Sequence, residues 1–196
     1  RRIIGSEHLA LLLRGEGPGG LDVGEDLAAA FRLVRDELGV ESVRAHAILH
    51  DVLGVYREGE DGVPVYDFDK VDLVIDRLLA TGLRPVVELS FMPEALAADT
   101  EPHVFDYVGL ISPPRELDRW ADLVETLVRH LVERHGLDEV AQWGFEVWNE
   151  ANLEVFWSGT PAEYMKMYDV TAAAVRAVDP RLKVGGPSSA AAGWVE

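Results

Sequence analysis

The sequence of 196 residues contains no cysteine, which excludes disulfide bonds, thiolate nucleophiles and cysteine-ligated metal sites together. It has only three lysines beside fifteen arginines, and only two asparagines, which lie within four residues of each other. No apolar run approaches the roughly 20 residues that a membrane-spanning helix needs. We therefore expect no integral membrane protein.

Basic residues are also few: 18 stand against 35 acidic ones, for a formal charge of −17. A phosphate backbone or an anionic lipid surface would be repelled over most of such a protein, so we expect neither nucleic acid nor a membrane as partner. The 48% of hydrophobic residues is ordinary for a globular domain. We expect a cytoplasmic protein, but secretion stays open because a signal peptide removed before Arg1 would leave no trace.

One pattern recurs along the chain: a short β-branched run, a loop, and then an amphipathic helix. The runs predict strands over 2–4, 42–49, 84–90, 140–148 and 182–185, and helices over 25–38, 69–81, 114–135 and 161–178. This alternation is typical of βαβ units on a parallel sheet. At about 40 residues per unit, eight units fall within the size range of a (β/α)8 barrel.

We therefore predict an α/β fold, a (β/α)8 TIM barrel of which about the first four βα units and strand five are present. A doubly wound open sheet is the alternative, but the sequence lacks the Gly-x-Gly-x-x-Gly and Walker-type loops that accompany it. The helical period predicts which side chains each helix buries. These are Leu27, Phe31, Val34 and Leu38 in the first helix, Val71, Val74, Ile75 and Leu78 in the second, and Trp120, Leu123, Val124, Leu127 and Leu131 in the third.

Charged side chains interrupt three strands that should otherwise be apolar. Arg44 and His46 share one face of the second strand, Glu88 lies in the third, and Glu146 and Glu150 alternate in the fourth. An unpaired buried charge costs several kcal/mol, so these groups must pair with one another or reach solvent at the barrel mouth. Either they form a self-contained ion-pair network, or they hold His46 and Glu150 in position for function.

Glu150 ends an apolar and aromatic strand, and such surroundings help a carboxyl group to hold a proton near neutral pH. Cleavage of a glycosidic bond needs such an acid to protonate the leaving oxygen, together with a second carboxylate on the other side of the sugar. Asn149 beside it offers both a donor and an acceptor for a sugar hydroxyl. The pair therefore predicts an acid/base carboxylate with an adjacent sugar contact.

The segment 143–150, Trp-Gly-Phe-Glu-Val-Trp-Asn-Glu, resembles the signature of glycoside hydrolase family 39, the β-xylosidases and α-L-iduronidases built on (β/α)8 barrels. Segments at 5–11, 43–46, 51–58, 87–96, 111–114 and 184–187 resemble the family in the same order. The resemblance implies that Glu150 is the general acid/base, that Asn149 contacts the hydroxyl next to the reacting carbon, and that His46 contacts the sugar. It implies no cofactor and no metal.

The resemblance at residues 91–93, Phe-Met-Pro, favours the β-xylosidase branch of the family. The implied activity is that of a retaining, exo-acting β-xylosidase that releases xylose from xylo-oligosaccharides, with a small oligosaccharide or glycoside as partner. An iduronidase-like or other family glycosidase is the alternative, and a homo-oligomer stays open. Ala151 departs from the proline that the family usually has after the acid/base glutamate, which frees the backbone without removing the carboxyl group.

In the family the nucleophile is a glutamate near the end of strand seven, and nothing in this sequence matches it. We therefore expect residues 1–196 to be an incomplete catalytic domain, truncated at both ends and lacking about strands six to eight, which does not turn over substrate by itself. Two other classes stay open: a non-catalytic sugar-binding barrel, and a metal-dependent hydrolase or isomerase with His46, Glu88 and Glu150 as ligands. The absence of His-x-His and His-Glu-x-x-His pairs disfavours the second.

Overall fold

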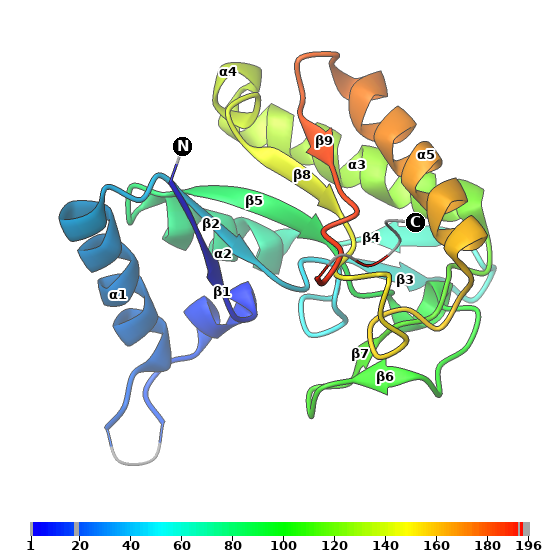
Figure 1. The fold of residues 1–196 in the computed structure, drawn as a ribbon, viewed down its shortest axis with the longest axis horizontal. Coiled ribbons are helices and arrows are strands. Elements are labelled where there is room, and N and C mark those ends of the chain that lie inside the picture. Colours follow the sequence, from blue (N-terminus) through cyan, green and yellow to red (C-terminus); the bar gives the residue numbers. More distant parts are fainter. Residues whose placement is uncertain (1, 18–19, 192, 194–196) are drawn as a thin grey trace.

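The computed structural model describes residues 2–17, 20–191 and 193. Its centre is a five-stranded sheet in which the strands neighbour each other in chain order and every pair is parallel (Figure 1). These strands are β1 (Ile3–Ser6), β2 (Ser42–Ala45), β5 (Arg84–Leu89), β8 (Gly144–Val147) and β9 (Val184–Gly185). A doubly wound sheet would reverse its strand order, whereas a barrel keeps it. The predicted fold, consecutive βα units of a (β/α)8 barrel, is confirmed.

The helices follow the strands and lie around one side of the sheet (Figure 1). They are α1 (Val23–Leu38), α2 (Asp69–Leu79), α3 (Leu117–His135), the short α4 (Leu137–Val140) and α5 (Pro161–Val178), with 3-10 turns η1 (Leu9–Leu13) and η2 (Glu94–Leu96). Helices α3 and α5 pack against each other over the end of the sheet that contains β8 and β9. No helix in the described ranges is long and apolar enough to cross a lipid bilayer.

The predicted apolar stripes of α2 and α3 are confirmed, because every side chain named for them is buried. In α1 the prediction is partly wrong. Phe31 is buried, but Leu38 is 56% exposed, and Ala28 is a buried residue that the pattern did not name. Leu38 is the last helical residue before Gly39, whose left-handed φ of 63° ends the helix, so its side chain lies beyond the packed face.

Sequence signals at the helix ends agree well with the structure. The Asp22 side chain accepts a hydrogen bond from the Glu25 backbone N–H, 3.0 Å away, and so caps α1. Thr160 and Glu163 cap α5 reciprocally, as a capping box. Helix α3 begins three residues later than predicted, because Pro114 pairs instead with Ala97 in an isolated bridge.

The loops contain two antiparallel hairpins that the sequence did not predict, β3 (Tyr56–Glu58) with β4 (Pro64–Tyr66), and β6 (His103–Val104) with β7 (Gly109–Leu110). Four of the predicted strands were too long, the second and the fourth by the most. The second ends at Ala45, and the Leu49 N–H bonds to the Ser90 carbonyl outside the ladder. The fourth begins at Gly144, because α4 occupies the residues before it.

Candidate active site

Three charged side chains from adjacent strands meet on the sheet face away from the helices. Glu88 on β5 and Glu146 on β8 are direct partners in the strand register, so their like charges would repel each other. Arg44 on β2 reaches across β5 and supplies the opposite charge. Its Nε and Nη2 donate to the two carboxylate oxygens of Glu146 at 2.9 and 2.8 Å, and Nη2 also lies 2.9 Å from Glu88 Oε2. The predicted ion-pair network is confirmed.

Asn149 is joined to this cluster by its side-chain oxygen. Arg44 Nη2 donates to Asn149 Oδ1 at 2.8 Å, and since a guanidinium cannot accept, this contact fixes which way the amide is turned. Asn149 is 2% exposed, and its Nδ2 group is left as the donor for a ligand. The orientation suits an amide that donates to a sugar hydroxyl.

His46 follows β2 directly and faces Glu88. Its Nδ1 lies 3.0 Å from Glu88 Oε2, and its ring stacks on Phe91 and also lies near Phe105. Burial alone would lower the pKa of His46, but contact with the Glu88 carboxylate outweighs burial and leaves the pKa raised. His46 therefore favours its charged form.

Glu150 follows β8 in a turn of unusual backbone conformation. Trp148 has a φ of 68° and Glu150 a φ of 43°, in the left-handed region that residues other than glycine rarely adopt, at a cost of about 1–3 kcal/mol each. The turn is anchored by the buried Trp148, whose indole N–H donates to the Phe156 carbonyl at 2.7 Å. Proline at 151 would favour extended backbone at residue 150, and Ala151 imposes no such restriction.

The carboxylate of Glu150 makes no hydrogen bond or ion pair with other side chains of the described chain, and it acts on Arg44 only through charge. It lines a hollow of about 340 Å³ on the open face of the sheet. Arg44, Glu146 and Asn149 line the same hollow, and Ile3, Ile4 and Gly5 of β1 form its opposite wall. The structure thus brings Glu150 and Asn149 to one cavity, with His46 beside the charged cluster beneath it.

The turn that carries Glu150 is also tied to the next barrel unit. The Asn152 side chain donates to the Ala190 carbonyl at 3.1 Å and accepts from the Ala190 N–H at 2.9 Å. This double contact imitates a short stretch of β-ladder. Both asparagines of the chain therefore have fixed contacts around Glu150.

Aromatic rings next to His46 form a group that sequence reasoning missed. Phe105, in the turn between β6 and β7, lies 6.2 Å from His46 and 5.7 Å from Phe156 between ring centroids, and it is 38% exposed. Phe91 packs edge-on against Trp148 at 5.9 Å. An exposed ring beside polar donors suits the apolar face of a sugar. The strands that place Phe105 are two residues long, too short for any alternating pattern.

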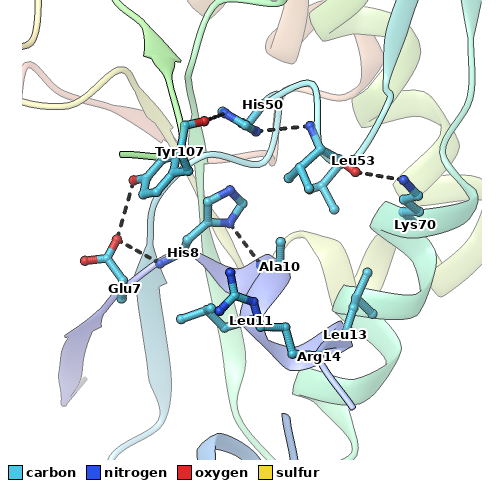
Figure 2. A pocket seen from close by; sticks show the side chains of 11 residues that line it. Glu7, His8, Ala10, Leu11, Leu13, Arg14, His50, Leu53, Lys70 and Tyr107 are labelled. Atoms are coloured by element: carbon cyan, nitrogen blue, oxygen red, sulfur yellow. Dashed lines mark hydrogen bonds between the residues drawn. The ribbon is translucent and has the colours of Figure 1, made fainter. Parts of the chain in front are cut away.

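A second cavity, of about 400 Å³, lies beside the site between η1, the loop after β2 and α2 (Figure 2). His8, His50 and Tyr107 meet there edge to edge. The His50 Nδ1 accepts from the Val52 N–H, and its Nε2 lies 2.9 Å from the Tyr107 carbonyl, to which it donates. Burial, with smaller contributions from His50, His46 and Arg14, lowers the pKa of His8 to about 4.

The three side chains weighed as metal ligands do not form a set. His46 and Glu88 are in contact, but the part of the chain that the structure describes has no group of three His, Asp or Glu side chains arranged to hold a metal ion. Glu88 already bonds to Ser90 and lies against Arg44.

A parallel barrel sheet with an Asn-Glu pair after its fourth strand defines the class of (β/α)8-barrel glycosidases. The family model of glycosyl hydrolases family 39 matches residues 8–196, and the chain belongs to that family. It is 44% identical over 195 residues to a β-xylosidase of Caldicellulosiruptor saccharolyticus, a match that covers 99% of this chain and 38% of that protein.

A solved structure gives the same result. A monomeric β-xylosidase from Caulobacter crescentus CB15 aligns with a TM-score of 0.87 at 44% identity, over 99% of this chain and 37% of the other. The α-L-iduronidase of Mus musculus is more distant, at 32% identity over 151 residues, with 76% of this chain and 22% of that protein covered. The chain thus spans well under half the length of the relatives it matches.

Proposed function

We propose that the protein carrying this chain is a retaining β-xylosidase in which Glu150 is the general acid/base. The observation that carries the proposal is the placement of Glu150: its carboxylate makes no hydrogen bond or ion pair with the described residues, and it lies on a cavity shared with the Asn149 amide. In a retaining mechanism this carboxyl group protonates the leaving oxygen and later deprotonates the attacking water. Asn149 Nδ2 donates to the hydroxyl next to the reacting carbon, and His46 contacts the same sugar.

The second carboxylate is proposed to come from outside these 196 residues. Glu88 and Glu146 are paired with Arg44, and Glu146 lies on β8 only four residues before Glu150, which follows the same strand. Such an arrangement does not put two carboxylates on opposite faces of one sugar ring. A glutamate from a later strand would complete the pair.

The xylose branch is favoured over the iduronic acid branch by identity, 44% against 32%. The proposed substrates are short xylo-oligosaccharides, from one end of which the enzyme releases single xylose units. A sugar-binding barrel without catalysis is the alternative of another class, and it predicts binding without turnover.

The test uses the complete protein and two substrates, an aryl β-xyloside and an aryl α-L-iduronide. Glu150→Ala is expected to lower kcat/KM for the aryl β-xyloside by about 10²- to 10⁴-fold. Azide, a nucleophile that needs no general base, should restore turnover of the aryl xyloside by this variant. Glu154→Gln, an exposed carboxylate in the same loop, is the matched control and should keep wild-type activity. Turnover of the iduronide alone, or of neither substrate, would contradict the proposal.

A further inference from the structure

The buried carboxylate of Glu88 has one oxygen whose hydrogen-bond partner is not supplied by the ion pairs already described. Glu88 is fully buried, and its Oε1 accepts from the Ser90 hydroxyl. Its Oε2 lies 2.9 Å from Arg44 Nη2 and 3.0 Å from His46 Nδ1. A carboxylate oxygen without water needs a donor, and one of these two nitrogens must provide it.

Arg44 Nη2 cannot be that donor, because it carries two hydrogens and both are in use. Glu146 Oε1 and Asn149 Oδ1 each accept from it at 2.8 Å in hydrogen-bond geometry. The contact of Arg44 Nη2 with Glu88 Oε2 is close in distance but lacks that geometry, and so does the contact of His46 Nδ1 with the same oxygen at 3.0 Å. Arg44 therefore offers Glu88 charge but no hydrogen, which leaves His46 Nδ1.

His46 Nδ1 must then hold a proton. If it did not, two buried lone pairs would lie 3.0 Å apart, and neither atom has a partner in hydrogen-bond geometry in the described chain. The charge balance decides whether the second ring nitrogen, Nε2, also holds a proton. Glu88 and Glu146 bring two negative charges and Arg44 one positive charge, so the cluster is neutral when His46 is an imidazolium.

The groups facing His46 from other elements have opposing effects. Glu7, after β1, favours the charged ring, whereas Arg44 disfavours it. His8, in the neighbouring cavity, also interacts with His46 electrostatically, but it stays neutral because its own pKa lies near 4. The Glu88 carboxylate, in direct contact, is the strongest influence in favour of charge.

We propose that Glu88 is a positioning residue that keeps His46 as an imidazolium, with Nδ1–H directed at Glu88 and Nε2–H available as a donor. A neutral ring with its proton on Nδ1 would present Nε2 as an acceptor instead. Glu88 thus decides whether His46 donates to a sugar oxygen or accepts from a sugar hydroxyl. The part of this inference that concerns sugar rests on the proposed function.

The first test follows the His46 ring by NMR in the complete protein, with its signals assigned by their loss in His46→Gln. At pH 7 the wild type should show protons on both ring nitrogens. Glu88→Gln should lower the His46 pKa by about one unit or more, since it removes the adjacent charge. The control is Glu139→Gln, which removes the carboxylate of the partly exposed ion pair with Arg84. This variant should leave the His46 pKa unchanged. A neutral His46 in the wild type, or an unmoved pKa in Glu88→Gln, overturns the proposal.

The second test compares kcat/KM for an aryl β-xyloside between Glu88→Gln and wild type from pH 5 to 8. The variant should be weaker by about tenfold at the alkaline end, where its His46 is neutral, and should approach wild type at pH 5, where both rings are charged. A deficit that is the same at every pH would mean that Glu88 only supports the structure. If neither protein cleaves xyloside, the proposed function fails, while the NMR result still decides the role of Glu88.

Discussion

His8 is buried and His46 half-buried, both just beyond strand ends, yet their surroundings shift their pKa values in opposite directions. Burial disfavours the charged form of both rings. His46 faces a carboxylate that reverses this effect, whereas His8 Nδ1 accepts from the Ala10 N–H and the ring packs against His50 and Tyr107. Burial therefore dominates at His8, whereas a carboxylate partner outweighs burial at His46.

The two histidines also affect stability in opposite pH ranges. A raised pKa, as for His46, contributes stability at low pH that is lost as the pH rises through the folded-state value. A lowered pKa, as for His8, means that the unfolded chain takes up a proton between pH 6.5 and about 4 while the folded chain does not, so stability falls as the pH drops through that range.

The largest effect is expected from breaking the charged cluster itself. Arg44→Met leaves Glu88 and Glu146 buried without their cation, and should lower the free energy of unfolding of the complete protein by about 3–5 kcal/mol. Denaturant unfolding at pH 7 measures it. The control is Arg84→Met, which breaks a half-exposed bidentate pair with Glu139 and should cost about 1 kcal/mol or less. Equal losses in the two variants would show that the cluster is not tightly coupled.

A smaller effect is expected from the His8 region. His8→Asn keeps an acceptor for the Ala10 N–H but removes the titrating ring. The wild type should lose about 2 kcal/mol more than this variant between pH 7 and pH 5. Urea unfolding at both pH values gives the difference, and His103→Asn, at an exposed histidine, should behave like the wild type. The same pH dependence in His8→Asn and wild type would contradict the lowered pKa.

The smallest effect is expected where the second cavity meets Glu7. The Tyr107 hydroxyl lies 3.5 Å from Glu7 Oε1, at the limit of a hydrogen bond, while its ring stacks on Phe105 at 5.1 Å. Tyr107→Phe keeps the ring and should change the unfolding free energy by less than about 0.5 kcal/mol. A loss above 1 kcal/mol in thermal unfolding would mean that the hydroxyl matters more than its distance indicates.

Much of the fold was predictable because it depends on local periodicity. The buried stripe of α3 repeats every three or four residues, and the order of strands and helices follows from their alternation in the sequence. The hairpin β6–β7 was not predictable, since strands of two residues show no period and the pairing is fixed by the loop around them.

The site, too, was predictable from the sequence only in part. The motif placed Glu150 and Asn149 after one strand, and the charged strand positions predicted a pairing of Arg44 with Glu88 and Glu146. The close approach of Arg44 Nη2 to Glu146, Asn149 and Glu88 was not predictable, because it depends on atoms from residues far apart in the sequence. The cytoplasmic location and the oligomeric state stay predictions.

The double contact between Asn152 and Ala190 makes the position of Glu150, the proposed acid/base, a joint property of two consecutive barrel units. A shift of the turn after β8 relative to the segment after β9 would break both hydrogen bonds. A loop rearrangement in the fifth unit, with no change in the residues around Glu150, is therefore expected to move the carboxylate that is proposed to donate the proton.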